Sequence, residues 1–484
     1  MRVNERSAYA GLLLATAVAT LGAGSGATQP SATLRGAMQP GTTELPPTVL
    51  QLLDDQRVPA ITWAIVRDGA IASGARDRAL PASAAPSATA TFFHAASVTK
   101  PVVAVTAMRL ARAGRLDLDA PVTRYLREPA FTMLGERGLT TRQLLQHRSG
   151  LKDFERLDWL DPGRAASALR EAFNDPATLA FEKAPGGDFA YANLNYSLVG
   201  LVIENVTGEP FAQSVAKLAL QPFGAPGARL SCQDVAPSAL AAAHVLSSAG
   251  ESARSSLLPF NRAHSPSGGL CITATELAAW GARLLACESD DAPLTCAELE
   301  SMFPRAQERY GLGWYDEPIG AERAIWHDGS DAGYAAALLL VPARRLAIAV
   351  MTNFEFASAG VMAKTLAARE LGTRYAGKVE FPSRERWPEY AGTYYHAELR
   401  CARVTASERG LEVLYQTSDF PYELTRTRLM PKPEWDEGYF IGAFRGKLIW
   451  FGDLAEPTRS FLFMSSKKFV REAAGSTRCD GLRG

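Results

Sequence analysis

A serine and a lysine lie three positions apart in the S-x-x-K segment from Ser97 to Lys100. A serine hydroxyl is a weak nucleophile at neutral pH and needs a nearby base to accept its proton. The pattern around this segment predicts a helix from Ser97 to about Ala113, ended by Gly114, and residues three apart on a helix share one face. The Ser97 hydroxyl and the Lys100 amine can therefore meet at the helix start, where the helix dipole favours negative charge.

Alone, this pattern is weak, because an N-capping serine followed by a solvated lysine has the same sequence. Further polar segments follow it: L-T-T-R-Q-L-L-Q-H-R-S-G-L at 139–151, P-G-G-D-F-A-Y-A-N at 185–193, S-G-G-L at 267–270 and H-D-G-S at 327–330. Together with F-H-A-A-S-V-T-K at 93–100, and in this order over about residues 45–370, they resemble the class C β-lactamase-like family of serine hydrolases. That family includes penicillin-binding esterases and D-amino-acid peptidases.

The resemblance implies catalytic roles for three residues. Ser97 is expected to attack the substrate carbonyl and become acylated. Lys100 and Tyr191 are expected to share the proton transfer, and either of them could be the base. Asn193 is expected to hydrogen-bond Lys100 or the acyl side of the substrate.

The strand segment from His327 to Ser330 occupies the place of the family's K-T-G or H-x-G motif. The resemblance implies that His327, Asp328, Gly329 and Ser330 border the substrate, and that the backbone N–H groups of Ser97 and Ser330 form the oxyanion hole. A histidine is mostly neutral near pH 7, unlike the lysine of K-T-G. Asp328 would repel a carboxylate or attract an amino group if it faces the pocket; alternatively it points away and stabilises a turn.

These differences favour neutral esters or amides, or substrates with a free amino group, over penicillins and peptides ending in D-Ala. We therefore expect an esterase or a D-amino-acid-specific peptidase, with β-lactamase or D-Ala-D-Ala carboxypeptidase as the alternative. A catalytically idle ligand sensor is a further alternative. His147 and Ser149 are too close in sequence to form a Ser-His pair and are expected to form a structural turn. We expect no metal or organic cofactor, since neither C-x-x-C nor H-E-x-x-H occurs in the sequence.

The elements that position these residues come from both ends of the first 376 positions. A short helix over 49–56 and two strands over 61–75, turning at Asp68-Gly69, precede the Ser97 helix. A mainly helical region follows over 139–286. Strands are predicted over 311–315, 324–327, 334–341 and 346–352, then a helix over 358–371. This order predicts an α+β hydrolase domain over 47–376, with one antiparallel sheet built from both chain ends beside a helical region, as in the β-lactamase/transpeptidase fold.

A linker is predicted over 377–388 and a small β-barrel over 389–473, because short alternating strands at 392–395, 411–415, 447–451 and 461–464 are separated by turn residues. Tyr390-Ala391-Gly392-Thr393-Tyr394 resembles the opening of barrel domains appended to esterase and peptidase members of the family. Residues 474–484 are expected to form a tail.

The N-terminus predicts export to the periplasm or the medium. Residues 1–27 combine an arginine-containing start, an apolar stretch and small residues typical of a signal peptide. Residues 28–46, which are rich in Ser, Thr, Pro and Ala, are expected to form a flexible tether. The six cysteines fit an oxidising compartment; of the fifteen possible connectivities we expect Cys232–Cys271, Cys287–Cys296 and Cys401–Cys479. The 51 basic and 51 acidic residues cancel, which gives no indication of nucleic acid binding, and no later segment predicts stable membrane insertion. The expected partner is a small ester, amide or peptide substrate.

Overall fold

The computed structural model describes most of the chain from residue 44 onward. The predicted signal peptide, the tether before residue 44, linker residues 377–386 and all of the predicted tail except Cys479 lie outside the described residues. The described residues are 44–78, 86–153, 168–171, 173, 176–247, 251–255, 261–375, 387–397, 400–407, 410–416, 424–431, 439–444, 447–452, 461–464, 467–473 and 479.

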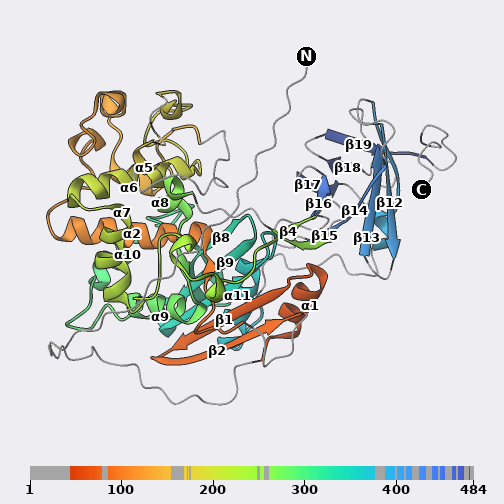
Figure 1. Cartoon of the computed structure of the whole chain (residues 1–484), viewed down its shortest axis with the longest axis horizontal. Helices are drawn as coiled ribbons and strands as arrows, with labels where there is room; N and C mark the ends of the chain where they lie inside the picture. The colour runs from red at the N-terminus through yellow and green to blue at the C-terminus, as the bar shows by residue number, and fades with distance from the viewer. Residues whose placement is uncertain are drawn as a thin grey trace, which may run out of the picture. The chain divides into compact units, whose positions relative to one another are not determined.

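An antiparallel sheet of six strands, in the order β2-β1-β10-β9-β8-β7, joins the two ends of the first domain (Figure 1). The N-terminal hairpin pairs directly with the last strand, so that Ala64 lies opposite Ala349. This confirms the predicted sheet built from both chain ends. Its strands are β1 (Ala60–Arg67), β2 (Ala70–Asp77), β7 (Tyr315–Ile319), β8 (Glu322–Asp331), β9 (Tyr334–Val341) and β10 (Leu346–Thr352).

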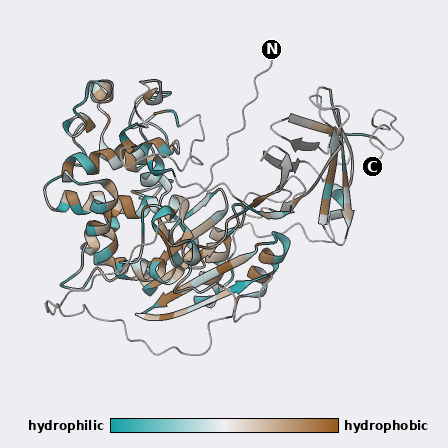
Figure 2. Ribbon diagram, in the orientation of Figure 1, coloured by the Kyte–Doolittle hydropathy of each residue, from teal (hydrophilic) through white to brown (hydrophobic). Residues whose placement is uncertain are grey.

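Every residue of β9 and β10 is buried, because helices cover both faces of the sheet centre (Figure 2). Along β9, Ala336, Leu338 and Leu340 face the helical region and α9 (Ala274–Leu285), whereas alternate residues face α1 (Pro47–Asp55) and α11 (Ala359–Glu370). The strand period of two thus divides the core into two layers.

The helical region carries the polar segments at 139–151 and 185–193. Its helices are α2 (Thr99–Arg112), α3 (Thr132–Glu136), α4 (Thr141–Leu145), α5 (Ala168–Glu171), α6 (Asn193–Thr207), α7 (Phe211–Val215), α8 (Ser265–Gly268) and α10 (Cys296–Met302). Two short strand pairs, β3 (Phe93–His94) with β6 (Cys271–Ile272) and β4 (His244–Leu246) with β5 (Ser252–Arg254), were not predicted.

The predicted strand over 311–315 is wrong except for its last residue, which begins β7. Gly313 has φ +88°, a left-handed conformation outside the strand region, and a Cβ at this position would lie 3.1 Å from the Lys100 carbonyl oxygen and from Pro101 Cα. The segment before β7 is therefore a loop that passes over the start of α2.

The C-terminal strands form a separate sheet in the order β14-β13-β12-β11-β19-β18-β17-β16-β15, which confirms a small β domain but not a closed barrel. Strands β14 and β15 are separated by Leu429 alone, and among the described residues no ladder of hydrogen bonds joins them. Strand β15 has two residues, of which Pro431 lacks an N–H donor. The bounds are α12 (Trp387–Tyr390), β11 (Gly392–His396), β12 (Arg400–Ser407), β13 (Gly410–Gln416), β14 (Leu424–Arg428), β15 (Met430–Pro431), β16 (Tyr439–Phe444), β17 (Lys447–Gly452), β18 (Phe461–Met464) and β19 (Lys467–Arg471).

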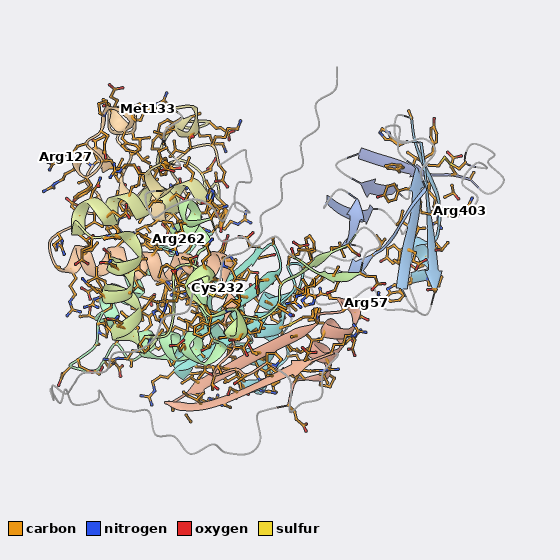
Figure 3. All side chains as sticks on the ribbon, viewed as in Figure 1. Arg57, Arg127, Met133, Cys232, Arg262 and Arg403 are labelled. Atoms are coloured by element: carbon orange, nitrogen blue, oxygen red, sulfur yellow. A yellow bond between two sulfur atoms is a disulfide. The ribbon has the colours of Figure 1, made fainter. Side chains whose placement is uncertain are left out.

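The three predicted disulfides, Cys232–Cys271, Cys287–Cys296 and Cys401–Cys479, are confirmed (Figure 3 labels Cys232). The first of them joins β6 to the helical region beside the Ser97 segment. None of the helices within the described ranges has the length and apolar character needed to cross a membrane.

Candidate active site

Ser97 lies in a tight turn that leads directly into α2. The turn, Ala96–Val98, is a 3-10 helix, so α2 begins two residues later than predicted. Ala96 has φ +46°, which is rare for a residue with a side chain and is typical of functional turns. Ser97 is partly exposed, whereas its neighbours from Phe93 to Lys100 are buried. The turn therefore presents one hydroxyl at the surface of an otherwise buried segment.

The S-G-G-L segment holds this turn in place. The backbone N–H of Ala95 donates to the Leu270 carbonyl at 2.8 Å, and the Leu270 N–H donates to Thr99 Oγ1 at 2.9 Å. Thr99 Oγ1 in turn donates to the Ala96 carbonyl at 2.6 Å. The S-G-G-L segment thus holds the nucleophile turn through backbone hydrogen bonds.

Lys100 lies fully buried on the same side of the helix start as Ser97. Its Nζ donates to Ser97 Oγ at 2.9 Å, to Asn193 Oδ1 at 2.8 Å and to the Ser267 carbonyl at 2.7 Å. Burial lowers the pKa of Lys100 to about 7, against the opposing effect of the negative charges of Asp153 and Asp331. Near neutral pH the amine is therefore present in both protonation states.

Tyr191 approaches the same hydroxyl from the loop before α6. Its OH donates to Ser97 Oγ at 2.8 Å, and Lys100 Nζ lies 4.9 Å from the centre of its ring. Burial raises the pKa of Tyr191 well above its usual range, although the hydrogen bond to Ser97 opposes this shift. The phenol is therefore protonated at neutral pH.

Asn193 is oriented by Asp153, a residue that the sequence reasoning missed. Asn193 Nδ2 donates to Asp153 Oδ2 at 3.3 Å, which leaves Asn193 Oδ1 to accept from Lys100. Asp153 Oδ1 also accepts from the backbone N–H of Leu194 at 3.0 Å, in the first turn of α6. Asp153 follows the S-G-L segment by two residues, so a longer motif would have included it.

His147 supports the Tyr191 ring. The two ring centres are 4.2 Å apart, and His147 Nδ1 accepts from the backbone N–H of Ala192 at 3.2 Å. Ser149 Oγ accepts from the backbone N–H of Leu151 at 3.0 Å. Both residues therefore serve the turn, as predicted, and neither forms a Ser-His pair.

His327 is buried and bonded to Tyr310, another residue that the sequence reasoning missed. His327 Nε2 and Tyr310 OH are 2.9 Å apart, and His327 Nδ1 donates to the Asp328 carbonyl at 2.5 Å. Burial, aided by the Lys100 charge, lowers the pKa of His327 to about 3, so the ring is neutral at ordinary pH. His327 thus brings no positive charge to the site.

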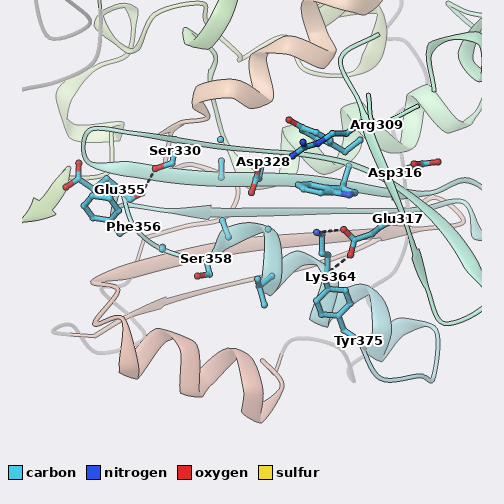
Figure 4. A pocket seen from close by; sticks show the side chains of 18 of the residues that line it. Arg309, Asp316, Glu317, Asp328, Ser330, Glu355, Phe356, Ser358, Lys364 and Tyr375 are labelled. Atoms are coloured by element: carbon cyan, nitrogen blue, oxygen red, sulfur yellow. Dashed lines mark hydrogen bonds and ion pairs between the residues drawn. The ribbon is translucent and has the colours of Figure 1, made fainter. Parts of the chain in front are cut away.

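Gly329 is the point at which β8 meets the Ser97 turn. A Cβ at Gly329 would lie 2.4 Å from the backbone N of Ser97 and 2.7 Å from the Ala95 carbonyl oxygen. Ser330 follows it, and its hydroxyl donates to the Glu355 carbonyl on the other face of the sheet (Figure 4). Ser330 can therefore serve the site through its backbone N–H rather than its hydroxyl.

Asp328 lies on the opposite face of β8 from His327, as the strand period requires. Its side chain is exposed, and Asp328 Oδ2 lies beside Gly360 of α11, 2.8 Å from where a Cβ of that glycine would be. The two residues that distinguish this strand from K-T-G therefore act on different faces of the sheet.

Among the residues that the structure describes, no three or more His, Cys, Asp or Glu side chains form a group that could hold a metal ion.

Comparison with known proteins identifies relatives of this arrangement. The family model described as Beta-lactamase matches residues 45–371. Esterase EstB of Burkholderia gladioli is 34% identical over 197 residues, which are 36% of this chain and 47% of the esterase. A D-aminopeptidase of Brucella anthropi is 26% identical over 261 residues, 51% of this chain and 47% of that protein. The chain thus spans about half the length of each of these two relatives.

A solved structure shows the same fold. The octameric penicillin-binding protein homologue from Pyrococcus abyssi superposes with a TM-score of 0.61 at 20% identity, over 87% of this chain and 98% of that one. Because the family model spans 45–371, more than half of the chain, this protein belongs to the β-lactamase family.

Proposed function

We propose that this protein is a serine hydrolase that cleaves esters or amides through an acyl-enzyme on Ser97. The observation that carries the proposal is the convergence of Lys100 Nζ and Tyr191 OH on Ser97 Oγ, at 2.9 and 2.8 Å. A hydroxyl that is partly exposed, and that touches a buried amine with a pKa of about 7, meets the requirements for an activated nucleophile.

In the proposed acylation, neutral Lys100 accepts the Ser97 proton while Ser97 Oγ forms a bond to the substrate carbonyl carbon. The carbonyl oxygen becomes an oxyanion, for which we propose the backbone N–H groups of Ser97 and Ser330 as donors; each donor is worth about 3 kcal/mol in comparable sites. The close approach of Gly329 to Ser97 N supports this pairing.

The tetrahedral intermediate then collapses, and the bond to the leaving group breaks. The departing alkoxide or amine takes a proton from Tyr191 OH, and the Lys100 ammonium returns its proton to the Tyr191 oxygen. In deacylation a water molecule attacks the carbonyl of the acyl-enzyme ester and gives a proton to Lys100. The bond from this carbon to Ser97 Oγ then breaks, the Lys100 ammonium returns the proton to Ser97 Oγ, and the acid product is released. We assign the base to Lys100, because its pKa is lowered whereas that of Tyr191 is raised.

The substrate class proposed is neutral or amino-bearing esters and amides, including D-amino-acid peptides. The names of the two relatives, an esterase and a D-aminopeptidase, support this class. The neutral His327 supports it too, because the strand that carries a cation in K-T-G enzymes here has no charge to receive a substrate carboxylate at that position. We therefore place β-lactamase and D-Ala-D-Ala carboxypeptidase activity second.

We also propose that the protein works outside the cytoplasm. Three disulfides, none of them near a redox-type C-x-x-C motif, support an oxidising compartment. Fractionation of cells that express the full chain, with mass measurement of the mature N-terminus, tests this proposal together with the predicted cleavage after residue 27. A product that keeps its first 27 residues in the cytoplasm would contradict both.

Labelling with a fluorophosphonate tests the nucleophile. We expect the wild type and the exposed-serine control Ser289→Ala to be labelled equally, and Ser97→Ala not at all. Equal labelling of Ser97→Ala would remove Ser97 from its proposed role. Turnover of p-nitrophenyl esters, D-amino-acid amides and a chromogenic cephalosporin by the same three proteins ranks the substrate classes. No turnover by the wild type over this panel would favour the idle sensor instead.

A further inference from the structure

A cavity lies along the α11 side of β8, next to the proposed active site (Figure 4). Its volume is about 790 Å³, within the range of pockets that bind small molecules. Gly329 and Ser330 line it, and Gly329 also lies against the backbone N of Ser97. The cavity therefore reaches the strand segment that borders the nucleophile, although Ser97, Lys100 and Tyr191 do not line it.

The charges on its wall are mostly negative. Among the lining cations, Lys364 is already matched, because its Nζ lies 2.6 Å from Glu317 Oε2. Arg309 lies on the ring of Phe189, 5.1 Å from its centre. Asp328 is exposed on the same wall, one residue before Gly329. A carboxylate therefore stands where the cavity meets the strand beside Ser97.

The negative charge of Asp328 reaches the proposed catalytic groups. Burial raises the pKa of Tyr315 to about 12, and the Asp328 charge adds to this shift. Burial likewise raises the pKa of Tyr191, with a smaller contribution from Asp328. Because Asp328 directly precedes Gly329, which lies against the backbone N of Ser97, a ligand charge bound at Asp328 would be close enough to the site to belong to the same substrate molecule.

Aromatic rings form another part of the cavity wall. Trp326 and Tyr315 stack with their ring centres 5.0 Å apart, and both line the cavity. Lys364 Nζ lies 3.5 Å from the centre of the Trp326 ring, so this wall already holds one ammonium group against an aromatic face. A second ammonium group between such rings and a carboxylate has favourable partners on both sides.

From these observations we propose that the cavity binds a positively charged amino group of the substrate, and that Asp328 selects it. The scissile ester or amide then lies at Ser97. This inference rests on the proposed function, since it names the substrate class of that same site. Of the two roles considered for Asp328 from the sequence, it assigns the attraction of an amino group.

Two sets of matched substrates test it. The p-nitrophenyl esters of aminohexanoic, heptanoic and adipic acids place a positive, neutral or negative group at similar length on the acyl side. Acetylthiocholine and its neutral analogue dimethylbutyl thioacetate place a positive or a neutral group on the leaving-group side. We expect wild-type kcat/KM to favour the cationic member of at least one set by about fivefold, an increment typical of one carboxylate contact with a cation.

Asp328→Asn should bring that cationic-to-neutral ratio toward one, whereas the exposed control Asp290→Asn should keep the wild-type ratio. An unchanged ratio in Asp328→Asn would overturn the inference. So would a wild-type preference for the anionic ester, which would make Arg309 the dominant charge. If neutral esters are turned over but cationic esters are not preferred, only this inference is refuted and the proposed function stands. No turnover of any ester refutes the proposed function, and the inference with it.

Discussion

Lys100 Nζ lies 2.9 Å from Ser97 Oγ, and the lysine is completely buried. Burial lowers the pKa of Lys100 to about 7, because an ammonium ion loses its hydration when it is enclosed by protein. The three oxygens around Nζ hold the amine in place: the ammonium ion can donate to all of them, whereas the neutral amine can donate to two and accept from the Ser97 hydroxyl. This relationship between the two residues determines how the proposed reaction should depend on pH.

The first prediction concerns the pH dependence of the wild type. Below about pH 7 Lys100 is an ammonium ion and cannot accept a proton, whereas above it the neutral amine can. With a neutral ester, kcat/KM should therefore rise with pH through an apparent pKa of about 7 and then level off. Lys100→Met should lose about a thousandfold in kcat/KM, as expected when a general base is removed. An acid limb near pH 4 would point to a carboxylate base instead.

The second prediction separates the two candidate bases. Tyr191→Phe keeps the ring that stacks on His147 but removes the OH that donates to Ser97. We expect kcat/KM to fall about 100-fold, because leaving-group protonation is impaired. The acid limb should stay near pH 7, since the tyrosine pKa lies well above its usual range. Loss of this limb in Tyr191→Phe would show that Tyr191, and not Lys100, is the base.

The third prediction concerns Asp331, whose negative charge raises the pKa of Lys100 against the effect of burial. Asp331 lies at the end of β8, with its Oδ2 3.5 Å from His94 Nε2. Removal of its charge leaves the burial effect less opposed, so the lysine pKa should fall. Asp331→Asn should therefore move the acid limb of kcat/KM to lower pH, whereas Asp119→Asn, which breaks a surface pair with Arg142, should not. A shift to higher pH would contradict the electrostatic account.

The motifs and their family resemblance were sufficient to predict the residues that surround the Ser97 hydroxyl and the Lys100 amine. Ser97, Lys100, Tyr191 and Asn193 each lie in a segment with a recognisable spacing, and the structure brings all four together. The three disulfides were also predicted, because each pair lies within one segment of the expected layout.

The residues that the sequence did not reveal act through space on members of these segments. Asp153, Tyr310 and Asp331 affect Asn193, His327 and Lys100, and burial sets the direction of the pKa shifts. Burial depends on the packing of distant elements, which a motif does not contain.

Asp328 shows a different limit. The sequence prediction left the orientation of Asp328 open, although it expected both His327 and Asp328 in one strand segment. Because β8 continues to Asp331, His327 and Asp328 necessarily point to opposite faces. The barrel prediction was wrong for a related reason: closure depends on which strands pair rather than on strand number, and the two outermost strands, β14 and β15, do not pair with each other.

The fourth prediction compares two disulfides. Cys232–Cys271 closes a loop of 39 residues and Cys287–Cys296 one of nine. By loop entropy the first contributes about 4 kcal/mol and the second about 2.5 kcal/mol to the free energy of unfolding. The Cys232→Ala/Cys271→Ala variant should therefore show the larger fall in Tm.

The same variant should also lose activity, since Cys271 pairs with His94 just before the Ser97 turn. The Cys287→Ala/Cys296→Ala variant is the control and should keep wild-type kcat/KM at low temperature. A larger fall in Tm for this control would contradict the prediction that Cys232–Cys271 contributes more to the free energy of unfolding.

The fifth prediction tests the contact between β8 and the nucleophile turn. A Cβ at Gly329 would lie 2.4 Å from Ser97 N, a distance at which the backbone must move. Gly329→Ala should therefore displace the Ser97 and Ser330 N–H groups from each other and lower kcat by about 100-fold or more, the cost typical of a lost oxyanion donor. Gly268→Ala is the matched control, because its Cβ would lie 3.9 Å from Ala96 and requires no movement. Circular dichroism and Tm establish that both variants fold. Wild-type kcat in a folded Gly329→Ala protein would mean that this strand does not supply the oxyanion donor.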